Sequence, residues 1–178
     1  MNARSVAKVA SPDFFDVLGG CHREIRVHLD KLTAIVSQLQ IAAPNEHARS
    51  QAREVIAFFT GPAREHNFDE ERHVFPTLAA CDDAEVKRVA ETLCEDHAWI
   101  ELCWLDIEPQ LAAVAAGLCP DDIPALCSAA EQFVKLSREH MAVEESVLYP
   151  QLRRRVKPYV LRSISREMAA RRGAGWSV

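Results

Sequence analysis

The stretch "HNFDEERHVFP", residues 66–76, recurs in altered form as "HMAVEESVLYP", residues 140–150. Both stretches carry His, two consecutive Glu and Pro at the same four places, with an aromatic residue before the Pro. Each stands within a longer stretch whose hydrophobic residues recur every three or four positions, which predicts a helix. The repeated charges are therefore expected on helix faces that point towards a core.

The repeat extends beyond these two stretches. His22 precedes His66 by 44 residues, and His97 precedes His140 by 43. Each half of the chain thus has a first helix with one His and a second helix with His-x-x-x-Glu, whose two ligand-type residues lie one turn apart on one face. We predict an all-α protein, an up-down-up-down four-helix bundle over residues 13–155, followed by a short basic C-terminal helix and tail over residues 156–178.

Local signals mark where the helices begin and break. Ser11 and Pro12 predict the start of the first helix, which Gly19-Gly20 should weaken. Gly61-Pro62 predicts a break in the second helix with Thr60 as the new cap, and Pro109 predicts a kink in the third.

The composition is that of an ordinary globular protein. No apolar run approaches 18 residues and the N-terminus has no apolar signal region, so we expect a cytoplasmic protein without membrane spans. The six cysteines form no C-x-x-C pair and are expected to be small buried side chains, with Cys21 of interest because it adjoins His22.

Two Glu and four His on core-directed faces need a counter-charge, because burying an unpaired carboxylate costs several kcal/mol. Two metal ions would supply it if both carboxylates bridge them and each ion also takes two imidazoles. Iron, manganese and zinc all suit imidazole and carboxylate ligands. The predicted ligands of this two-metal site are His22, His66, Glu70, His97, His140 and Glu144.

Glu101 breaks the repeat. It follows His97 by four residues, whereas the corresponding residue of the first half is Arg26. We include Glu101 among the predicted metal ligands, as a third carboxylate on one ion; the alternative is an ordinary salt bridge at the rim of the site.

Other polar residues near the ligands receive supporting roles. His73 lies three residues after Glu70, a di-iron spacing, but its counterpart is Val147, so we expect it to pack beside the site. Glu71 and Glu145 point about 100° away from the ligands and should form salt bridges or hydrogen bonds to them. His28 and His47 have no counterparts and are expected at the surface.

Basic residues collect near the C-terminus. Residues 153–172 hold eight Lys or Arg and one acid, Glu167, so the remainder of the chain has 13 basic and 25 acidic residues. Such a segment could contact nucleic acid, a membrane or an acidic protein partner, or it could dock on its own acidic body. It contains no recognisable nucleic-acid motif, so a protein partner is the interaction we retain.

The ligand pattern resembles the hemerythrin-like family, the HHE cation-binding domain, over roughly residues 13–152. That family has one His on its first helix, His-x-x-x-Glu on the second, His-x-x-x-His on the third and His-x-x-x-Glu or Asp on the fourth. The corresponding residues here are His22, His66 and Glu70, His97 and Glu101, and His140 and Glu144. The resemblance implies a non-haem, carboxylate-bridged di-iron centre. Oxygen-carrying members have His where Glu101 stands, so we expect this centre to be a poor reversible oxygen carrier.

We therefore expect a metal-binding protein that binds or senses oxygen, nitric oxide or peroxide, or holds iron. The alternative is a di-iron oxidoreductase: an oxidase, a peroxidase, a nitric oxide reductase or a protein that repairs iron–sulfur centres. For such an enzyme, Tyr149 and Cys21 are the candidate electron or proton donors.

Overall fold

The computed structural model describes residues 13–172. Helices joined by short loops make up this part of the chain, and none of its residues lies in a strand. The elements are α1 (Phe14–Leu39), α2 (Glu46–Thr60), α3 (Pro62–His73), α4 (Phe75–Ala79), α5 (Ala84–Ala116), α6 (Ile123–Val143), the π-helical turn η1 (Glu144–Leu148), α7 (Tyr149–Arg155) and α8 (Pro158–Arg172). Within this range, no helix combines the length and the apolar character that a membrane span requires.

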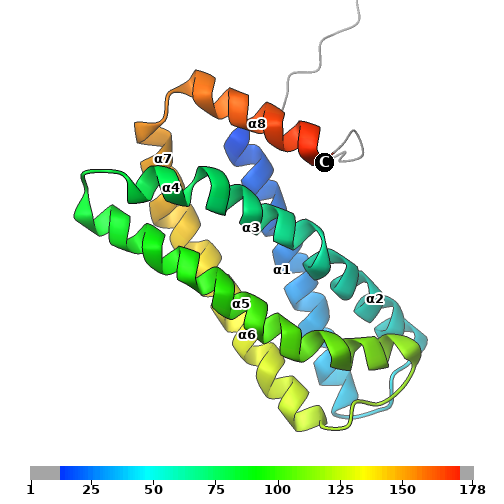
Figure 1. Cartoon of the computed structure of the whole chain (residues 1–178). Helices are drawn as coiled ribbons and strands as arrows, with labels where there is room; N and C mark the ends of the chain where they lie inside the picture. The colour runs from blue at the N-terminus through cyan, green and yellow to red at the C-terminus, as the bar shows by residue number, and fades with distance from the viewer. Residues whose placement is uncertain (1–12, 173–178) are drawn as a thin grey trace, which may run out of the picture.

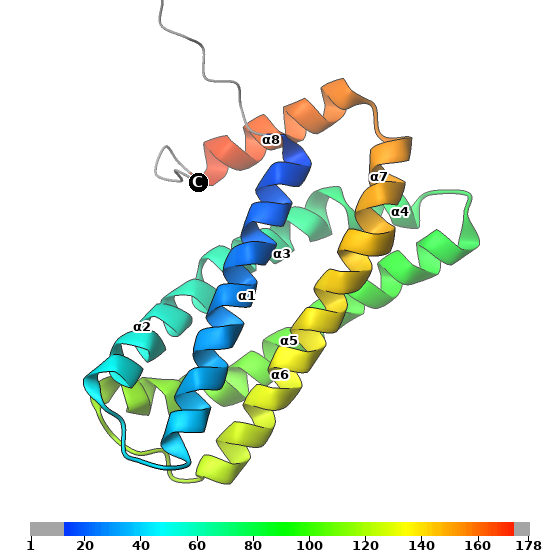
Figure 2. The same cartoon turned by 180° about the vertical axis from the view of Figure 1, so that it is seen from behind.

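The long helices form a bundle. Helix α1 packs against α2 and α6, and α5 packs against the same two helices from the other side. Figures 1 and 2 show that the connections from α1 to α2 and from α5 to α6 lie at one end of the bundle, and that α8 lies across the other end. The bundle interior is therefore closed at the α8 end by the basic C-terminal helix that the sequence predicted.

Side chains cap several of the helices. Asn45 accepts a hydrogen bond from the backbone N–H of Ala48 at the start of α2, and Asp83 and Asp122 accept equivalent bonds at the starts of α5 and α6. The break at Gly61-Pro62 is confirmed, with α2 ending at Thr60 and α3 starting at Pro62. The predicted cap was wrong: Gly61 occupies that position, and the Thr60 hydroxyl instead donates to the carbonyl of Ile56.

One other detail differs from the sequence prediction: Gly19 and Gly20 lie inside α1, where the fully buried Phe14 and Leu18 anchor the first turns. The kink at Pro109 stays a prediction. Helix α5 runs unbroken through this residue, which is exposed, so water can hydrogen-bond the carbonyl that Pro109 leaves unpaired. Ser11 and Pro12, predicted to start the first helix, lie outside the described residues.

Both copies of the repeated phrase bend the chain at the same place. In the first copy α3 ends at His73 and α4 begins at Phe75; in the second, α6 passes through η1 into α7 at Tyr149. Pro76 and Pro150 stand in the first turn of α4 and α7, where a proline is tolerated because its missing N–H has no helical partner there. A single π-helical turn often accompanies a functional site, and this one begins at the predicted ligand Glu144.

The apolar core is divided into two parts. One cluster fills the half of the bundle near the α1–α2 connection and includes Leu29, Trp104 and Phe133. The other lies beneath α8 and includes Leu18, Phe75 and Leu148. The predicted metal ligands come between these clusters along each helix, so a polar layer separates two dry layers.

Candidate metal centre

Six of the predicted ligands converge in the polar layer. One group that could hold a metal ion consists of His22, His66, Glu70 and Glu144, and the second consists of Glu70, His97, His140 and Glu144. All of these residues are buried. The two carboxylates belong to both groups, as expected if each carboxylate bridges two metal ions.

The distances between donor atoms suit metal coordination. The Nε2 atoms of His22 and His66 are 3.1 Å apart, and those of His97 and His140 are 3.0 Å apart. Glu144 lies between the pairs, with Oε1 2.8 Å from His140 Nε2 and Oε2 3.2 Å from His22 Nε2. Neighbouring donors on an octahedral ion with bonds of about 2.1 Å lie about 3.0 Å apart.

Glu70 approaches both groups through one oxygen. Its Oε2 is 3.2 Å from His66 Nε2 and 3.6 Å from His97 Nε2. This oxygen and both carboxylate oxygens of Glu144 are buried and have no aligned hydrogen-bond donor among the described residues. Buried carboxylate oxygens without a donor are rare because their desolvation is then uncompensated. A pair of cations between the imidazoles would satisfy all three, so the residues present fit a two-metal site.

The two buried carboxyl groups have strongly shifted pKa values. Burial, together with the nearby Glu70 charge, raises the pKa of Glu144 to about 8. Burial also acts to raise the pKa of Glu70, but His66 and His97 outweigh it and hold that pKa well below the usual range. One carboxyl therefore retains its proton near neutral pH, because two buried carboxylates this close cannot both ionise without a counter-charge.

The imidazoles are also shifted from their ordinary behaviour. Burial lowers the pKa of His66 to about 3 and that of His140 to about 4. For His97, burial acts to lower the pKa, but the nearby Glu70 carboxylate and the hydrogen bond to Glu71 outweigh it and raise the pKa to about 9. His66 and His140 are thus neutral imidazoles at pH 7, the form that binds a metal ion.

The second Glu of each repeated phrase orients a ligand on another helix. His22 Nδ1 donates to Glu145 Oε1 at 2.8 Å, and His97 Nδ1 donates to Glu71 Oε1 at 2.9 Å. Arg26 holds the Glu145 carboxylate through two hydrogen bonds of 2.8 Å. When Nδ1 carries the proton, Nε2 of a neutral imidazole turns its lone pair to the site. The supporting role predicted for these two Glu residues is confirmed.

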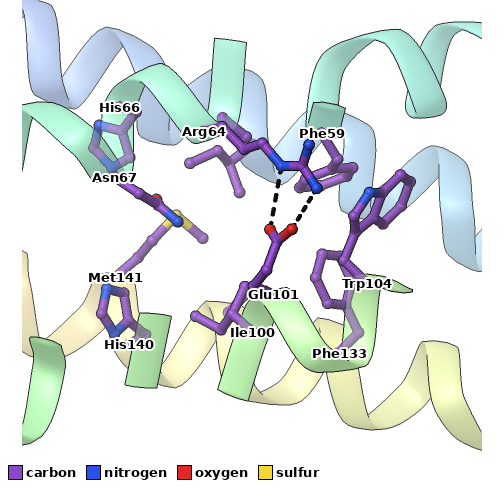
Figure 3. Close-up of a pocket in the computed structure, with 13 residues that line it drawn as sticks. Phe59, Arg64, His66, Asn67, Ile100, Glu101, Trp104, Phe133, His140 and Met141 are labelled. Atoms are coloured by element: carbon purple, nitrogen blue, oxygen red, sulfur yellow. Dashed lines mark hydrogen bonds and ion pairs between the residues drawn. The ribbon is translucent and has the colours of Figure 1, made fainter. Parts of the chain in front are cut away.

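Glu101 is not brought into either group of ligands. Its carboxylate pairs with the guanidinium of Arg64 on α3, with Arg64 Nε donating to Oε2 at 3.3 Å. Figure 3 shows this pair among the residues that line a pocket. Both side chains are about two-fifths exposed. One turn beyond His97, the Glu101 side chain reaches the edge of the polar layer, so the structure has the rim salt bridge that was the alternative interpretation.

The remaining histidines and Cys21 have non-ligand environments. His73 donates to Glu167 of α8 at 2.8 Å, which agrees with packing beside the site. The surface prediction for His28 was wrong: it is buried, with its ring stacked on Phe58 at a centroid distance of 3.9 Å. His47 is exposed as expected. Burial raises the pKa of Cys21 to about 12, so it stays an unreactive thiol.

The sequence offered Tyr149 only as a candidate electron or proton donor and did not predict its contact with the ligands. Its hydroxyl donates to Glu70 Oε1 and lies 3.1 Å from His22 Nε2, and its ring stacks on the His22 imidazole. Burial and the Glu70 charge raise the pKa of Tyr149 well above the ordinary range, so the metal-free protein holds a neutral phenol. The available signal was the aromatic residue before each repeated Pro.

Sequence reasoning also missed Asp69, the residue beside Glu70. Its fully buried carboxylate pairs with both Arg171 and Arg172 of α8. Arg171 also pairs with Glu65 and lies over the ring of Phe68. The basic C-terminal helix therefore docks on its own acidic body, one of the interpretations that the charge pattern allowed.

A family model now adds independent information to this geometry. The hemerythrin HHE cation-binding domain matches residues 13–152. The chain belongs to this family. No curated protein matches the sequence significantly. The family description fits a cation-binding function for the buried His and Glu cluster of this hemerythrin-like chain.

Proposed function

We propose that this hemerythrin-like protein holds two iron ions between the helices of an up-down-up-down bundle formed by residues 13–155. The observation that carries the proposal is the pair of buried His and Glu groups that share Glu70 and Glu144. His22 and His66 would bind one ion, His97 and His140 would bind the other, and both carboxylates would bridge. Bound iron would supply a redox-active centre with affinity for small ligands.

A pocket beside the proposed centre sets the size of such a ligand. It lies between α2, α3, α5 and α6 and is lined by His66 and His140, by the Arg64–Glu101 pair and by apolar side chains that include Phe59, Trp104 and Phe133. It offers about 40 Å³ to the centre of a water-sized sphere. A single water needs about 10–15 Å³ on this measure, so the pocket admits only a molecule of a few atoms.

The lining of this pocket is mainly apolar apart from the two imidazoles and the Arg64–Glu101 pair. Together, the small size and the apolar lining support dioxygen, nitric oxide or peroxide as the ligand.

Narrowing the pocket tests this proposal. Ala63, a buried pocket residue, would become Leu, and the exposed Ala112 of α5 would become Leu as the matched control. Both proteins would be loaded with ferrous iron and mixed with nitric oxide while absorbance is followed. We expect Ala63→Leu to bind about tenfold more slowly, a barrier higher by about 1.4 kcal/mol, with unchanged iron content. Equal rates in the variant and the control would remove this pocket as the ligand site.

A further inference from the structure

The repeat relates the two halves of the site. Tyr149 gives the second half of the chain an oxygen atom that the corresponding residue of the first half lacks. In the first half of the chain, the aromatic residue before Pro is Phe75, whose ring packs on His97 at a centroid distance of 5.1 Å. In the second half it is Tyr149, whose ring packs on His22 at 5.5 Å. The two rings occupy equivalent positions, but only one brings a hydroxyl into the polar layer.

That hydroxyl lies among the donor atoms of one metal position. Tyr149 Oη is 3.1 Å from His22 Nε2, the same separation as between His22 Nε2 and His66 Nε2. It also donates to Glu70 Oε1, whereas the other oxygen of that carboxylate, Oε2, lies 3.2 Å from His66 Nε2. Neighbouring donors on an octahedral ion lie about 3.0 Å apart. The phenol oxygen lies at this distance from His22 Nε2, as the proposed ligand His66 does.

We propose that Tyr149 Oη is a direct ligand of the metal ion held by His22 and His66, which makes that ion unlike the one held by His97 and His140. This inference rests on the proposed two-iron function. The phenol proton lies in the hydrogen bond to Glu70; as a metal ligand, the oxygen would release this proton to solvent.

The chain offers a clean spectroscopic test because it has only two tyrosines, Tyr149 and Tyr159. Tyr159 lies on α8 and is 60% exposed, so Tyr159→Phe is the matched control for Tyr149→Phe. Each protein would be loaded with iron, oxidised, and examined for iron content, visible absorption and resonance Raman scattering. A phenolate bound to ferric iron gives a visible charge-transfer band and enhanced tyrosine ring vibrations.

We expect the band in wild type and in Tyr159→Phe, and its loss in Tyr149→Phe. Ring-deuterated tyrosine incorporated into wild type should shift the enhanced vibrations, which keeps the test decisive if Tyr149→Phe does not fold. Two irons per chain without a tyrosine signal would overturn the ligation while leaving the two-iron site in place. A charge-transfer band that persists in Tyr149→Phe would likewise overturn ligation by Tyr149 and leave the two-iron site in place. Absence of bound iron in wild type would overturn both proposals.

Discussion

Replacing Glu144 with Gln should stabilise the metal-free protein while it weakens metal binding. Burial and the Glu70 charge raise the pKa of Glu144 from 4.5 to about 8. The folded metal-free protein therefore keeps a proton that the unfolded chain has released above pH 4.5. Because the folded state binds more protons, the free energy of unfolding falls as pH rises from about 4.5 to about 8. At about 1.4 kcal/mol per pH unit, the loss at pH 7 is about 3 kcal/mol.

Gln has nearly the shape of a protonated Glu and carries no charge at any pH, so the variant avoids this loss. Urea unfolding of chelator-treated wild type and Glu144→Gln at pH 5 and pH 7 measures the difference in the free energy of unfolding. We expect the two proteins to differ by less than about 1 kcal/mol at pH 5 and the variant to be more stable by about 3 kcal/mol at pH 7. Glu139→Gln, an exposed site on the preceding helix α6, is the control and should change stability by less than about 0.5 kcal/mol at either pH.

Metal ions should reverse the order of stability. An ion that binds only the folded protein stabilises it in proportion to the logarithm of the ion concentration over the dissociation constant, and wild type should gain more than the variant. The reasoning fails if metal-free Glu144→Gln is no more stable than wild type at pH 7. It also fails if the variant has the same advantage at both pH values, since burial of an ionisable carboxyl would then not be the cause.

Three further changes test separate parts of the structure. Glu71→Gln should weaken retention of metal about 10–100-fold in a chelator competition, because His97 loses its charged hydrogen-bond acceptor, whereas Glu95→Gln on the exposed face of α5 should have no effect. Phe133→Ala should lower the free energy of urea unfolding by about 3–5 kcal/mol, since the fully buried ring packs on Phe59 and Trp104; a loss below 1 kcal/mol would contradict this packing. Asp69→Asn should weaken docking of α8 by about 3 kcal/mol, seen as faster hydrogen exchange of α8 amides, while the exposed Asp82→Asn should leave that exchange unchanged.

The repeated phrase made much of the site predictable from the sequence. His66 with Glu70, and His140 with Glu144, stand at a helical spacing that brings both members to one face, and the matching register of His22 and His97 relates the other two helices. Burying such groups without a counter-charge is costly, so composition and spacing together indicated a metal site. The same comparison predicted the supporting role of Glu71 and Glu145. Each follows a ligand by one residue, and one residue turns the helix by about 100°, so these side chains point away from the metal ions.

Features that depend on the surroundings of a side chain were not predictable in this way. The sequence allowed Glu101 to be either a metal ligand or a partner in a salt bridge. Its pairing with Arg64 depends on the position of α3 relative to α5, which the sequence pattern does not give. His28 was expected at the surface, but Phe58 on α2 covers it. Asp69 was not singled out, and its buried carboxylate pairs with Arg171 and Arg172 from the distant helix α8. Each of these contacts joins segments that no local pattern relates.

The metal content of the protein tests the central claim most directly. Wild type would be loaded anaerobically with ferrous iron, passed through a desalting column and analysed for iron per chain beside Glu70→Ala and Glu101→Ala. Two tightly held irons in wild type, with both weakened in Glu70→Ala because that carboxylate belongs to both groups, is the result that the account predicts. The pairing of Glu101 with Arg64 predicts two irons in Glu101→Ala as well. Fewer than two irons in wild type, or full loading of Glu70→Ala, would contradict the account.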